Sequence, residues 1–511
     1  MPRYAAIDIG TNSIRMEAAE VTRDGPPRIL AAAREVTRLG ESVYLSERLS
    51  DGVIEATVKV LSRMAEQYKK LDVVGVRAVA TSAIRDASNQ AEFLARASEA
   101  AGAPVEVISG REEARLIHLG VESRWPHPDA RLMILDIGGG SAELIASENG
   151  RMREAVSRPL GAIRLQEMFF EHDPPAAEEL HRLQEYIAEK LAVPLRRFGD
   201  GKFGRMIATS ATAQTVASAV HRLGRAEREE ADRLRVPTAQ VRKLYGKLCG
   251  RNLARRRKIQ GIGPRRAEII IPGTAVLLRV LEAWRFPAYY YSAAGVRDGI
   301  IADLAARGVG RELSQLDREQ RREVEQLTRR YAVIPAHARK VAEMAHALFV
   351  SLQPLHELPP AYGKLLEAAA WLHDVGHYVN DVSHHKHSYY LVANSDIAGF
   401  TNREREFVAS LCRYHRKAMP AADHGDLQAL NGEEKRALGR LSALLRLADS
   451  LDRSHEQRVE SIHCRIREDQ VAIQLVSSQE VDLEQWAARR DGEIFRQVFG
   501  RSLAVTRAPQ S

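Results

Sequence analysis

The chain has 511 residues, more than one hydrophobic core organises, so its length indicates roughly two to four domains. Its content of 45% hydrophobic and 28% charged residues is ordinary for a soluble globular protein. The three cysteines are far apart and odd in number, which argues against a disulfide framework and favours a reducing compartment. The amino-terminal sequence lacks the layout of a signal peptide, and we expect a cytoplasmic protein without membrane spans.

Basic residues are in excess, with a net charge of +8, and they are unevenly placed. Such an excess is typical of a protein that meets nucleic acid, an acidic membrane surface or a small polyanion. Residues 251–266 (RNLARRRKIQGIGPRR) hold seven basic residues and no acidic one. Two interpretations stay open. The stretch is either a solvated helix face and loop, or a phosphate-binding strip whose guanidinium groups match phosphate oxygens.

The sequence contains an internal repeat whose first copy lies near the amino terminus. The segment IDIGTNS at residues 7–13 recurs as LDIGGGS at residues 135–141, and both copies follow an apolar, strand-like run. Each copy then continues into alternating apolar and polar residues, which predicts a second strand. The pattern of strand, aspartate, tight turn and strand is therefore used twice, and it predicts two related α/β subdomains that face a cleft.

The elements that follow the first repeat alternate between helix and strand through residues 1–124, which favours a layered α/β domain. We expect helices over residues 51–71 and 89–101, and strands over residues 73–80 and 105–109. Residues 125–305 continue in the same style as a second α/β domain. Its expected elements are helical insertions over residues 174–197 and 227–257 and a strand over residues 288–294.

The composition of the sequence changes near residue 313, where a highly charged segment precedes a series of predicted helices. Twelve of the 17 histidines lie in residues 331–463. We therefore expect residues 306–511 to form a separate all-α domain whose chemistry differs from that of the first two.

The repeated turns suit phosphate and magnesium together. Glycine allows the backbone N–H groups of residues 138–140 (Gly138, Gly139 and Gly140) to converge on phosphate oxygens. Carboxylates can hold a hydrated Mg²⁺ beside them. The candidate metal ligands are Asp8, Asp136 and Glu143, and the other candidate phosphate contacts are Thr11, Asn12, Ser13 and Ser141. The alternative is a pair of ordinary glycine-rich β-turns, but two copies in the same register argue against it.

At these residues the chain resembles a known family. The paired turns are similar to the phosphate motifs of the sugar kinase, heat-shock chaperone and actin superfamily. The two segments IDIGTNSIRM and LDIGGGSAELI resemble more closely the exopolyphosphatase and guanosine pentaphosphate phosphatase family. The resemblance implies two ribonuclease H-like (actin-like ATPase) subdomains and a homodimer. It also implies Mg²⁺ or Mn²⁺, with K⁺ as a further cofactor, a substrate such as polyphosphate or another polyanionic phosphate, and no nucleic-acid or membrane partner.

The segment VISGREEARL at residues 107–116 reads as a strand that ends at a helix amino terminus. Ser109 and Glu112 have the spacing of a capping box, so Glu112 has a structural role available. Both glutamates would also favour the helix dipole. Glu113 is left without an obvious structural role, and the resemblance implies that it activates the attacking water.

Three further segments resemble the family. TSAIRD at residues 81–86 matches the phosphate-contacting arginine segment through Arg85, although a surface arginine that caps a helix is the alternative. Residues 261–273 bring the pair Arg265 and Arg266, and residues 295–299 form a glycine-bounded turn. One segment departs. Relatives carry a Gly-Gly-Thr turn where this chain has TSAT at residues 209–212, which argues against direct backbone contact with a phosphate or nucleotide there.

His373 and Asp374 lie inside the apolar helical run LLEAAAWLHDVGH. With His337 upstream and Asp449 downstream, they resemble the ligand set of the HD-type metal phosphohydrolases. Imidazole with carboxylate suits a transition metal such as Mn²⁺, Fe²⁺ or Zn²⁺. Satisfied surface or core histidines are the alternative. Further histidines are available for a second metal or for phosphate: His384, His387 and His415.

These motifs together favour an exopolyphosphatase. Hydrolysis of guanosine pentaphosphate is the alternative within the family, because both reactions release a terminal phosphate. An ATP-dependent kinase of the same superfamily is a second alternative. A third is a sensor in which the α/β core binds a phosphorylated signal and the HD-type domain alone does chemistry.

Overall fold

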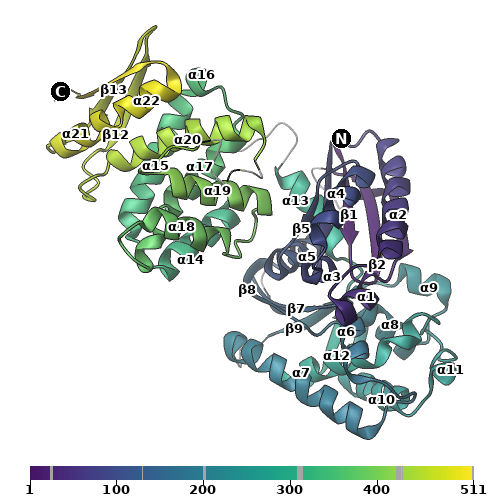
Figure 1. The fold of residues 1–511 in the computed structure, drawn as a ribbon. Coiled ribbons are helices and arrows are strands. Elements are labelled where there is room, and N and C mark those ends of the chain that lie inside the picture. Colours follow the sequence, from purple (N-terminus) through teal and green to yellow (C-terminus); the bar gives the residue numbers. More distant parts are fainter. Residues whose placement is uncertain are drawn as a thin grey trace. The chain divides into compact units, whose positions relative to one another are not determined.

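The structure is a computed structural model that describes residues 1–22, 27–128, 130–199, 203–307, 315–421, 427 and 430–508. Its contacts divide the chain into two units, Met1–Val309 and Gly310–Ser511. The first unit is built on two mixed β-sheets covered by helices, and the second is mainly helical (Figure 1). The predicted mixed α/β class of the first part and the helical character of the last part are therefore confirmed.

The first sheet has the order β3-β2-β1-β4-β5. Its central strand β1 pairs antiparallel with β2 and parallel with β4. Alternation along β1 divides its side chains between the two faces, since Ile7 packs under α2 and α4 whereas Ala6 packs under α5 and α13. The strands are β1 (Arg3–Ile9), β2 (Ser13–Glu20), β3 (Arg28–Val36), β4 (Gly75–Ala80) and β5 (Val105–Val107). The helices on them are α1 (Leu39–Ser46), α2 (Asp51–Lys69), α3 (Ser82–Asp86) and α4 (Gln90–Ala101).

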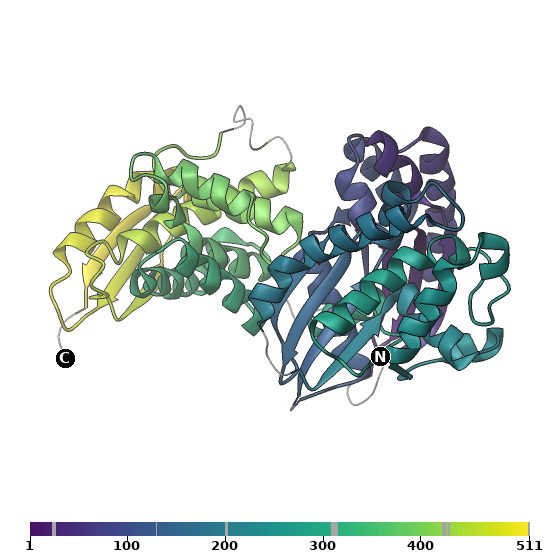
Figure 2. The ribbon, with the colours of Figure 1, turned by 90° about the horizontal axis from the view of Figure 1, so that it is seen from below.

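The second sheet, of order β10-β11-β9-β6-β7-β8, repeats this topology at its centre. Strand β6 pairs antiparallel with β7 and parallel with β9, as β1 does with β2 and β4. Figure 2 shows the strands of this sheet in one layer with helices over it. The strands are β6 (Arg131–Ile137), β7 (Ala142–Glu148), β8 (Arg151–Arg158), β9 (Arg205–Thr209), β10 (Arg235–Pro237) and β11 (Ala288–Tyr291).

The helices on the second sheet follow the expected insertions with one difference. The helix expected over residues 227–257 is broken by β10, because Pro237 ends that strand and caps the next helix, which Gly250 then terminates. The helices are α6 (Ala162–Phe169), α7 (Ala177–Phe198), α8 (Ser210–His221), α9 (Arg225–Glu230), α10 (Thr238–Cys249), α11 (Leu253–Arg256), η1 (Arg266–Glu268) and α12 (Ile270–Ala283).

Two helices, α5 (Gly110–Arg124) and α13 (Val296–Arg307), join the halves of the first unit. Ile117 of α5 packs on the second sheet, whereas Leu116 packs with α13 on the first. The helices cross at glycines, since a Cβ on Gly299 would lie 1.8 Å from the carbonyl oxygen of Leu116 and one on Gly120 would lie 2.2 Å from that of Gly295. Helix α13 thus returns to the first sheet, whereas the sequence placed it at the end of a second domain over residues 125–305.

The second unit packs its helices around one apolar core. The all-α expectation for residues 306–511 is wrong at the carboxyl-terminal end, where β12, β13 and β14 form a three-stranded sheet. The side chains of β13 (QVAIQLV) alternate between buried and half-buried, as a sheet with one covered face requires. The elements are α14 (Arg318–Arg330), α15 (Pro335–Ser351), α16 (Gln353–His356), α17 (Ala361–Leu372), η2 (Val375–Tyr378), α18 (His384–Ala393), α19 (Asn402–Tyr414), α20 (Gly432–Ser450), β12 (Ser461–Ile466), β13 (Gln470–Val476), α21 (Asp482–Arg490), α22 (Gly492–Phe499) and β14 (Ser502–Arg507).

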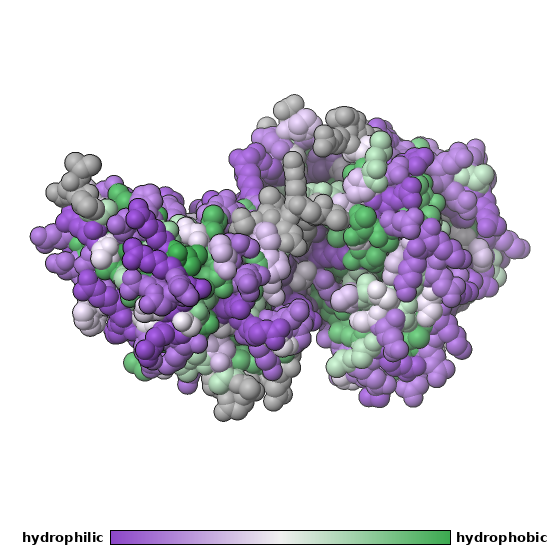
Figure 3. Space-filling model, turned by 90° about the horizontal axis from the view of Figure 1, so that it is seen from above, coloured by the Kyte–Doolittle hydropathy of each residue, from purple (hydrophilic) through white to green (hydrophobic). Residues whose placement is uncertain are grey.

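The surface seen in Figure 3 is largely hydrophilic, and its apolar residues lie in small groups. Among the described helices, none combines the length and the apolar character that crossing a membrane requires.

Candidate active site

The two repeated segments fold into matching hairpins. In the first, the backbone N–H of Gly10 donates to the carbonyl oxygen of Ser13 at 3.2 Å, and in the second Gly138 donates to Ser141 at 2.9 Å. These turns connect β1 to β2 and β6 to β7, and both lie at the carboxyl ends of parallel strand pairs. Ligands of open α/β sheets bind at that edge, so the duplicated turns lie where a phosphate site is expected.

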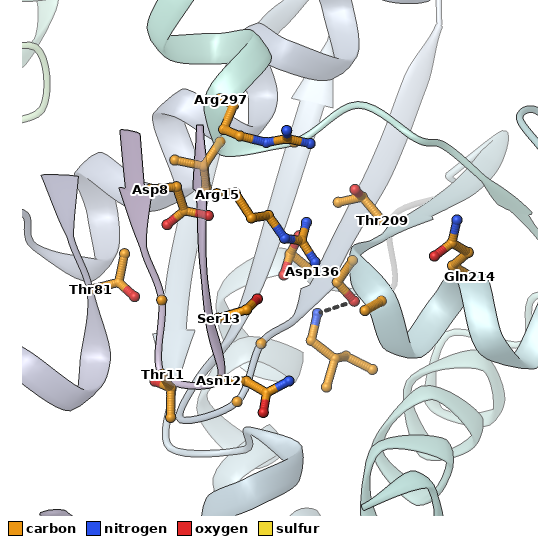
Figure 4. A pocket seen from close by; sticks show the side chains of 18 of the residues that line it. Asp8, Thr11, Asn12, Ser13, Arg15, Thr81, Asp136, Thr209, Gln214 and Arg297 are labelled. Carbon is orange, nitrogen blue, oxygen red and sulfur yellow. Dashed lines mark hydrogen bonds between the residues drawn. The ribbon is translucent and has the colours of Figure 1, made fainter. Parts of the chain in front are cut away.

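The hairpins differ in the partner of their aspartate. Asp8 lies opposite Arg15 in the first hairpin, and Asp136 lies opposite Glu143 in the second. Figure 4 shows Arg15 reaching from its strand toward Asp136. The first copy of the repeat therefore contributes a carboxylate and a guanidinium group, whereas the second contributes two carboxylates.

A cavity of about 300 Å³ lies between the hairpins (Figure 4). It is lined by most of the residues that the sequence predicted, which are Asp8, Thr11, Asn12, Ser13, Glu113, Asp136, Gly138, Gly139, Gly140, Ser141 and Arg266. It is also lined by residues that the sequence did not single out, among them Arg15, Arg34, Gln214, Tyr291 and Arg297. The cavity thus brings together both turns, the helix that carries Glu113, and arginines from four separate segments.

Glu113 lies in the first turn of α5. The side chain of Ser109 caps this helix by accepting a hydrogen bond from the backbone N–H of Glu112 at 3.1 Å. Glu113 is buried, and its Oε2 lies 3.7 Å from Arg85 Nη1 without a hydrogen-bond partner among the described residues. Burial, followed by the charge of Glu143, raises the pKa of Glu113 well above its usual value. An oxygen at a cavity wall without a hydrogen-bond donor is placed to accept a proton from a bound water.

Glu112, by contrast, has a structural role, which it fills through a buried ion network and not through the capping box that its spacing predicted. Arg115 donates to its carboxylate at 2.7 and 2.9 Å, and Arg77 of β4 donates at 3.1 Å. Both arginines also reach Asp303 of α13 at 3.0 Å. This buried ion network fastens the first turn of α5 to β4 and α13, and it therefore fixes the segment from which Glu113 projects.

The acidic side of the cavity fits a divalent cation. Burial, followed by the charge of Glu143, raises the pKa of Asp136 to about 8. Burial also raises the pKa of Asp8, although Arg15 and Arg297 oppose it. Glu143 does not line the cavity but is 1% exposed, and burial raises its pKa while Ser157 Oγ donates to its Oε1 at 2.8 Å. Carboxylates gathered in this way repel one another and favour a bound cation or a shared proton.

The basic side fits an anion. Burial, followed by the nearby charges of Arg34 and Arg15, lowers the pKa of Arg266 to about 9. Burial, followed by the charge of Arg297, also lowers the pKa of Arg15. Arginines that lower one another's pKa gain stability from a phosphate between them. The repeat contained a signal for Arg15, because it occupies the position of Glu143 in the other copy. Arg297 lies in the turn of residues 295–299 that the sequence had indicated, whereas Arg34 had no signal.

Two predicted phosphate contacts lie elsewhere. Arg85 donates to the carbonyl oxygen of Ile108 and faces Glu113, and it does not line the cavity. Arg265 lines a neighbouring pocket of about 660 Å³. This pocket continues from the cavity, with which it shares Arg34 and Arg266.

The basic residues of the stretch 251–266 differ in their roles. Arg256 is structural, since it is buried and donates to the carbonyl oxygens of Ala267 and Arg251. Arg257 forms an ion pair with Glu268 on the surface. Of the seven basic residues in the stretch, only Arg265 and Arg266 line the two pockets, so this stretch is not a continuous phosphate strip.

The TSAT segment at residues 209–212 contains no glycine, but one of its residues has a backbone conformation that is typical of glycine. Ser210 has a φ of +78°, which lies in the left-handed region that L-residues rarely adopt. Its Oγ accepts a hydrogen bond from the backbone N–H of Ile137 at 3.4 Å (Figure 4), and the Thr209 hydroxyl donates to the carbonyl oxygen of Ala294. Both residues line the cavity. The segment therefore forms a turn with a left-handed residue although it contains no glycine, and side-chain oxygens line it.

The helical unit gathers the four residues of the expected HD-type set. His337 Nε2 lies 3.4 Å and His373 Nε2 lies 3.5 Å from Asp449 Oδ1. The same two nitrogens lie 3.8 and 3.5 Å from Asp374 Oδ2. Burial alone would lower the pKa of His373. The neighbouring carboxylates of Asp374 and Asp449 outweigh burial, so the pKa of His373 is raised. In the residues that the structure describes, the ligand atoms of His337, His373 and Asp449 lie close enough together to hold one metal ion, whereas Asp374 groups with His377 and His384.

More histidines surround the other oxygen of Asp374. His384 Nε2, His377 Nε2 and His415 Nε2 lie 3.4, 3.6 and 3.9 Å from Asp374 Oδ1. The sequence predicted His384 and His415 here but not His377, although its spacing of three residues from Asp374 places both on one face of a helical turn. The predicted His387 does not line this centre.

Comparison with known proteins gives matches over both units of the chain. Residues 18–308 match the model of the Ppx/GppA phosphatase family, and residues 320–490 match that of Ppx/GppA phosphatase domain III. A Ppx/GppA family member from Aquifex aeolicus is 29% identical, with a TM-score of 0.54 over 60% of this chain and 98% of that chain. An exopolyphosphatase from Cytophaga hutchinsonii is 25% identical, with a TM-score of 0.55 over 58% of this chain and 96% of that chain. Since the first family model alone spans more than half of the sequence, the chain belongs to the Ppx/GppA phosphatase family.

Proposed function

We propose that the α/β cleft hydrolyses the terminal phosphate of inorganic polyphosphate. The observation that carries this proposal is that one cavity gathers carboxylates and arginines together. Asp8, Asp136 and Glu113 line it with Arg15 and Arg266, and Arg15 interacts electrostatically with both aspartates. A phosphate chain with its divalent cation satisfies both kinds of charge at once, whereas a neutral substrate satisfies neither.

Asp8, Asp136 and Glu143 fit Mg²⁺, because the ion binds through few carboxylates and keeps several waters, and Mn²⁺ shares its preference for oxygen. The burial that raises the pKa of each carboxyl is offset when a cation replaces the proton. When bound, the ion would offset the negative charge of the phosphate groups.

The chain's own residues supply the remaining chemistry. Glu113 Oε2 accepts a proton from water as the water oxygen attacks the terminal phosphorus. The bond from that phosphorus to the bridging oxygen breaks, which releases orthophosphate and a chain shorter by one unit. Arg15, Arg266 and Arg297 neutralise the phosphate oxygens, and the amides of the glycine turn donate to them. Positioning and electrostatics therefore provide most of the catalysis.

The neighbouring pocket supports a long polyanion as substrate. Besides the two arginines that it shares with the cavity, it is lined by Arg38, Arg225, Arg228 and Arg265. Its described lining includes no aromatic side chain on which a guanine base would stack. Four glutamates also line it: Glu41 and Glu268 pair with Arg38, Glu229 pairs with Arg225, and Glu35 pairs with Arg63. Arg34, Arg228, Arg265 and Arg266 keep the lining positive on balance. The charge along this path therefore favours further phosphate units over a nucleoside.

A comparison of three substrates tests the proposal. Orthophosphate release is measured from long-chain polyphosphate, guanosine pentaphosphate and ATP under one Mg²⁺ concentration. We expect kcat/KM to be about tenfold or more higher for polyphosphate, because only that chain fills both pockets. A preference for guanosine pentaphosphate would establish the alternative within the family, and a preference for ATP with transfer to an acceptor would establish a kinase.

We also propose that the helical unit holds a divalent transition metal at its HD-type residues. His337, His373, Asp374 and Asp449 offer the mixture of imidazole and carboxylate that Mn²⁺, Fe²⁺ and Zn²⁺ accept. A homodimer, a K⁺ requirement and a cytoplasmic location stay predictions from the resemblance. Sedimentation analysis, activity against K⁺ concentration and cell fractionation test them.

A further inference from the structure

The second glycine turn rests on the first turn of helix α6. The carbonyl oxygen of Gly138 accepts a hydrogen bond from the backbone N–H of Ala162 at 3.0 Å. That of Gly139 accepts from the backbone N–H groups of Ile163 and Arg164 at 2.9 and 3.1 Å. Because the C=O and N–H of a trans peptide point in opposite directions, the N–H groups that follow these carbonyls point away from α6. The residues of the turn line the cavity, so these N–H groups are available to a phosphate there.

The first turn is held in the same way by the start of α1. The carbonyl oxygen of Thr11 accepts from the backbone N–H of Gly40 at 2.9 Å, and that of Asn12 accepts from the backbone N–H of Arg38 at 3.2 Å. The internal repeat therefore extends to the helix that follows the third strand of each copy. All of these contacts join backbone to backbone.

The last carbonyl oxygen of the second turn is held by a side chain instead. Arg164 Nε donates to the carbonyl oxygen of Gly140 at 2.8 Å. Its Nη2 donates to Ser82 Oγ at 3.3 Å and pairs with Asp86. The guanidinium also covers the ring of Tyr44, 4.1 Å from the ring centroid. One planar group therefore fixes the peptide after Gly140 and fastens it to α3 in the other half of the unit.

The hydroxyl of Tyr44 lies where three phosphate segments meet. Its oxygen lies 3.4 Å from Thr11 Oγ1 in the first turn and 3.3 Å from Ser82 Oγ at the start of α3. A Cβ on Gly140 of the second turn would lie 1.7 Å from the same oxygen. Helix α1, which carries Tyr44, contacts both α3 and α6 (Figure 1). The position of this hydroxyl therefore sets how closely the two turns approach.

These two side chains act from outside the cavity. Arg164 and Tyr44 line neither the cavity nor the basic pocket beside it. They line a separate pocket of about 350 Å³, whose other lining residues are Val43, Glu47, Asp86 and Pro159. Their effect on a bound phosphate is therefore exerted through the turn that they hold.

We propose that Arg164 and Tyr44 form a positioning pair, which holds the peptide after Gly140 with its N–H toward a bound phosphate and sets the spacing of the two turns. This inference rests on the proposed function in one respect, namely that the cavity binds the reacting phosphate. It adds two residues that never touch the substrate but determine how well the turn stabilises the transition state.

Substitution of Arg164 tests the pair. kcat, KM and melting curves of the full-length protein are measured for Arg164→Lys and Arg164→Met, beside Arg197→Met, whose arginine pairs with Glu154 on the surface. We expect kcat to fall about tenfold or more in both variants and KM to change less than about threefold, because misaligned amides lose most in the transition state. Lysine keeps the charge but cannot hold the carbonyl oxygen, the hydroxyl and the ring at once. Control-level kcat in either variant of Arg164 overturns the pair.

Chemical rescue separates positioning from folding. Arg164→Ala leaves a space beside the 350 Å³ pocket, through which a small cation can enter. We expect ethylguanidinium to raise the kcat of this variant at least about threefold and ethylammonium at the same concentration to raise it less, since only the planar ion both donates and stacks. A loss of kcat that both cations or neither cation restores assigns Arg164 to charge or to folding and overturns its positioning role.

Tyr44→Phe guards against a variant that fails to fold, because it deletes only the hydroxyl and keeps the ring beneath Arg164. We expect kcat to fall about threefold relative to Tyr186→Phe, whose ring packs against Phe169 on α7. Combining Tyr44→Phe with Arg164→Met should lower kcat little further than Arg164→Met alone, because the two residues act as one unit. Equal kcat in the two phenylalanine variants, or losses that multiply in the double variant, overturns the joint role.

The positioning pair and the proposed function fail in different measurements. All rates are measured with whichever of polyphosphate, guanosine pentaphosphate and ATP the native protein hydrolyses fastest. A native preference for guanosine pentaphosphate contradicts polyphosphate as the substrate but leaves the expected ratios between variants and controls unchanged. Ratios near one contradict the positioning pair, whichever substrate the native protein prefers.

Discussion

The α/β cleft and the histidine centre of the helical unit both gather carboxylates, but they prepare them in different ways. The cleft offers only oxygen ligands and places arginines opposite them. The helical centre offers imidazoles whose second nitrogens are held by carbonyl or carboxylate partners. Oxygen ligands suit Mg²⁺, which takes part of its coordination from water and substrate, whereas oriented imidazoles hold a transition metal by themselves. We therefore expect the cleft to be completed by its substrate and the helical centre to be complete before any ligand arrives.

The largest expected effect breaks the chemistry of the cleft alone. Glu113→Gln keeps the shape of the side chain and removes the proton acceptor, so phosphate release from polyphosphate should fall by a factor on the order of 10² or more. Polyphosphate binding should persist because no cation is lost. Turnover and equilibrium binding are measured beside Glu55→Gln, an exposed glutamate of α2. Near-normal turnover of Glu113→Gln would remove this residue from the mechanism.

The next effect concerns the ion of the cleft. Asp136→Asn and Glu143→Gln each delete a candidate carboxylate, so the Mg²⁺ concentration at half-maximal activity should rise about tenfold. Manganese binding to the helical centre should not change, because its ligands are separate. An unchanged Mg²⁺ titration in both variants would show that the ion is held elsewhere.

A smaller effect is expected from the pocket beside the cleft. Arg228→Gln and Arg265→Gln each remove one positive charge from the path beyond the cavity, so KM for long-chain polyphosphate should rise about threefold to tenfold. KM for tripolyphosphate should change less, because a short chain is held mainly by the cavity. Arg242→Gln, which pairs with Glu282 on the surface, is the control. Equal changes for both chain lengths would contradict a continuous path.

The smallest effect on polyphosphate hydrolysis sharpens the contrast between the two regions. His373→Ala combined with Asp374→Ala should strip the transition metal and change the Mg²⁺-dependent release of phosphate less than about twofold. A melting curve must accompany the assay, because both residues lie in the helical core. A folded double variant that loses phosphate release while Glu113→Gln retains it would move the chemistry to the helical centre.

These two sites also show what a sequence reveals about a fold. The hairpins were predictable because both copies of the repeat keep one register, and the same comparison would have identified Arg15 from its place opposite Asp8. Arg34 was not predictable, because only tertiary contact brings β3 to the cavity, and the turn of residues 295–299 was indicated without a role for Arg297. The sheet β12–β14 was overlooked because helical signals surround it, even though β13 alternates clearly.

The helical ligand set was predictable for a different reason. His373 and Asp374 are adjacent, and the run around them marks a buried helix on which a polar pair is conspicuous. Arg85 lies 3.7 Å from Glu113 but not at the cavity wall, and its predicted contact with phosphate stays a prediction. Sequence spacing locates a side chain on an element, but it does not decide toward which neighbour a long arginine turns.

The position of α5 between the two sheets has a consequence for how the cleft can close. Ile117 holds this helix to the second sheet, while Leu116 and the crossing at Gly299 hold it to the first. A helix held on both faces cannot follow one sheet without sliding over the other. Any hinge rotation of the halves therefore shears along α5 and moves Glu113 at its end. The distance from this glutamate to a bound chain then depends on the angle between the halves, so the rotation that closes the cleft also aligns Glu113 with the chain.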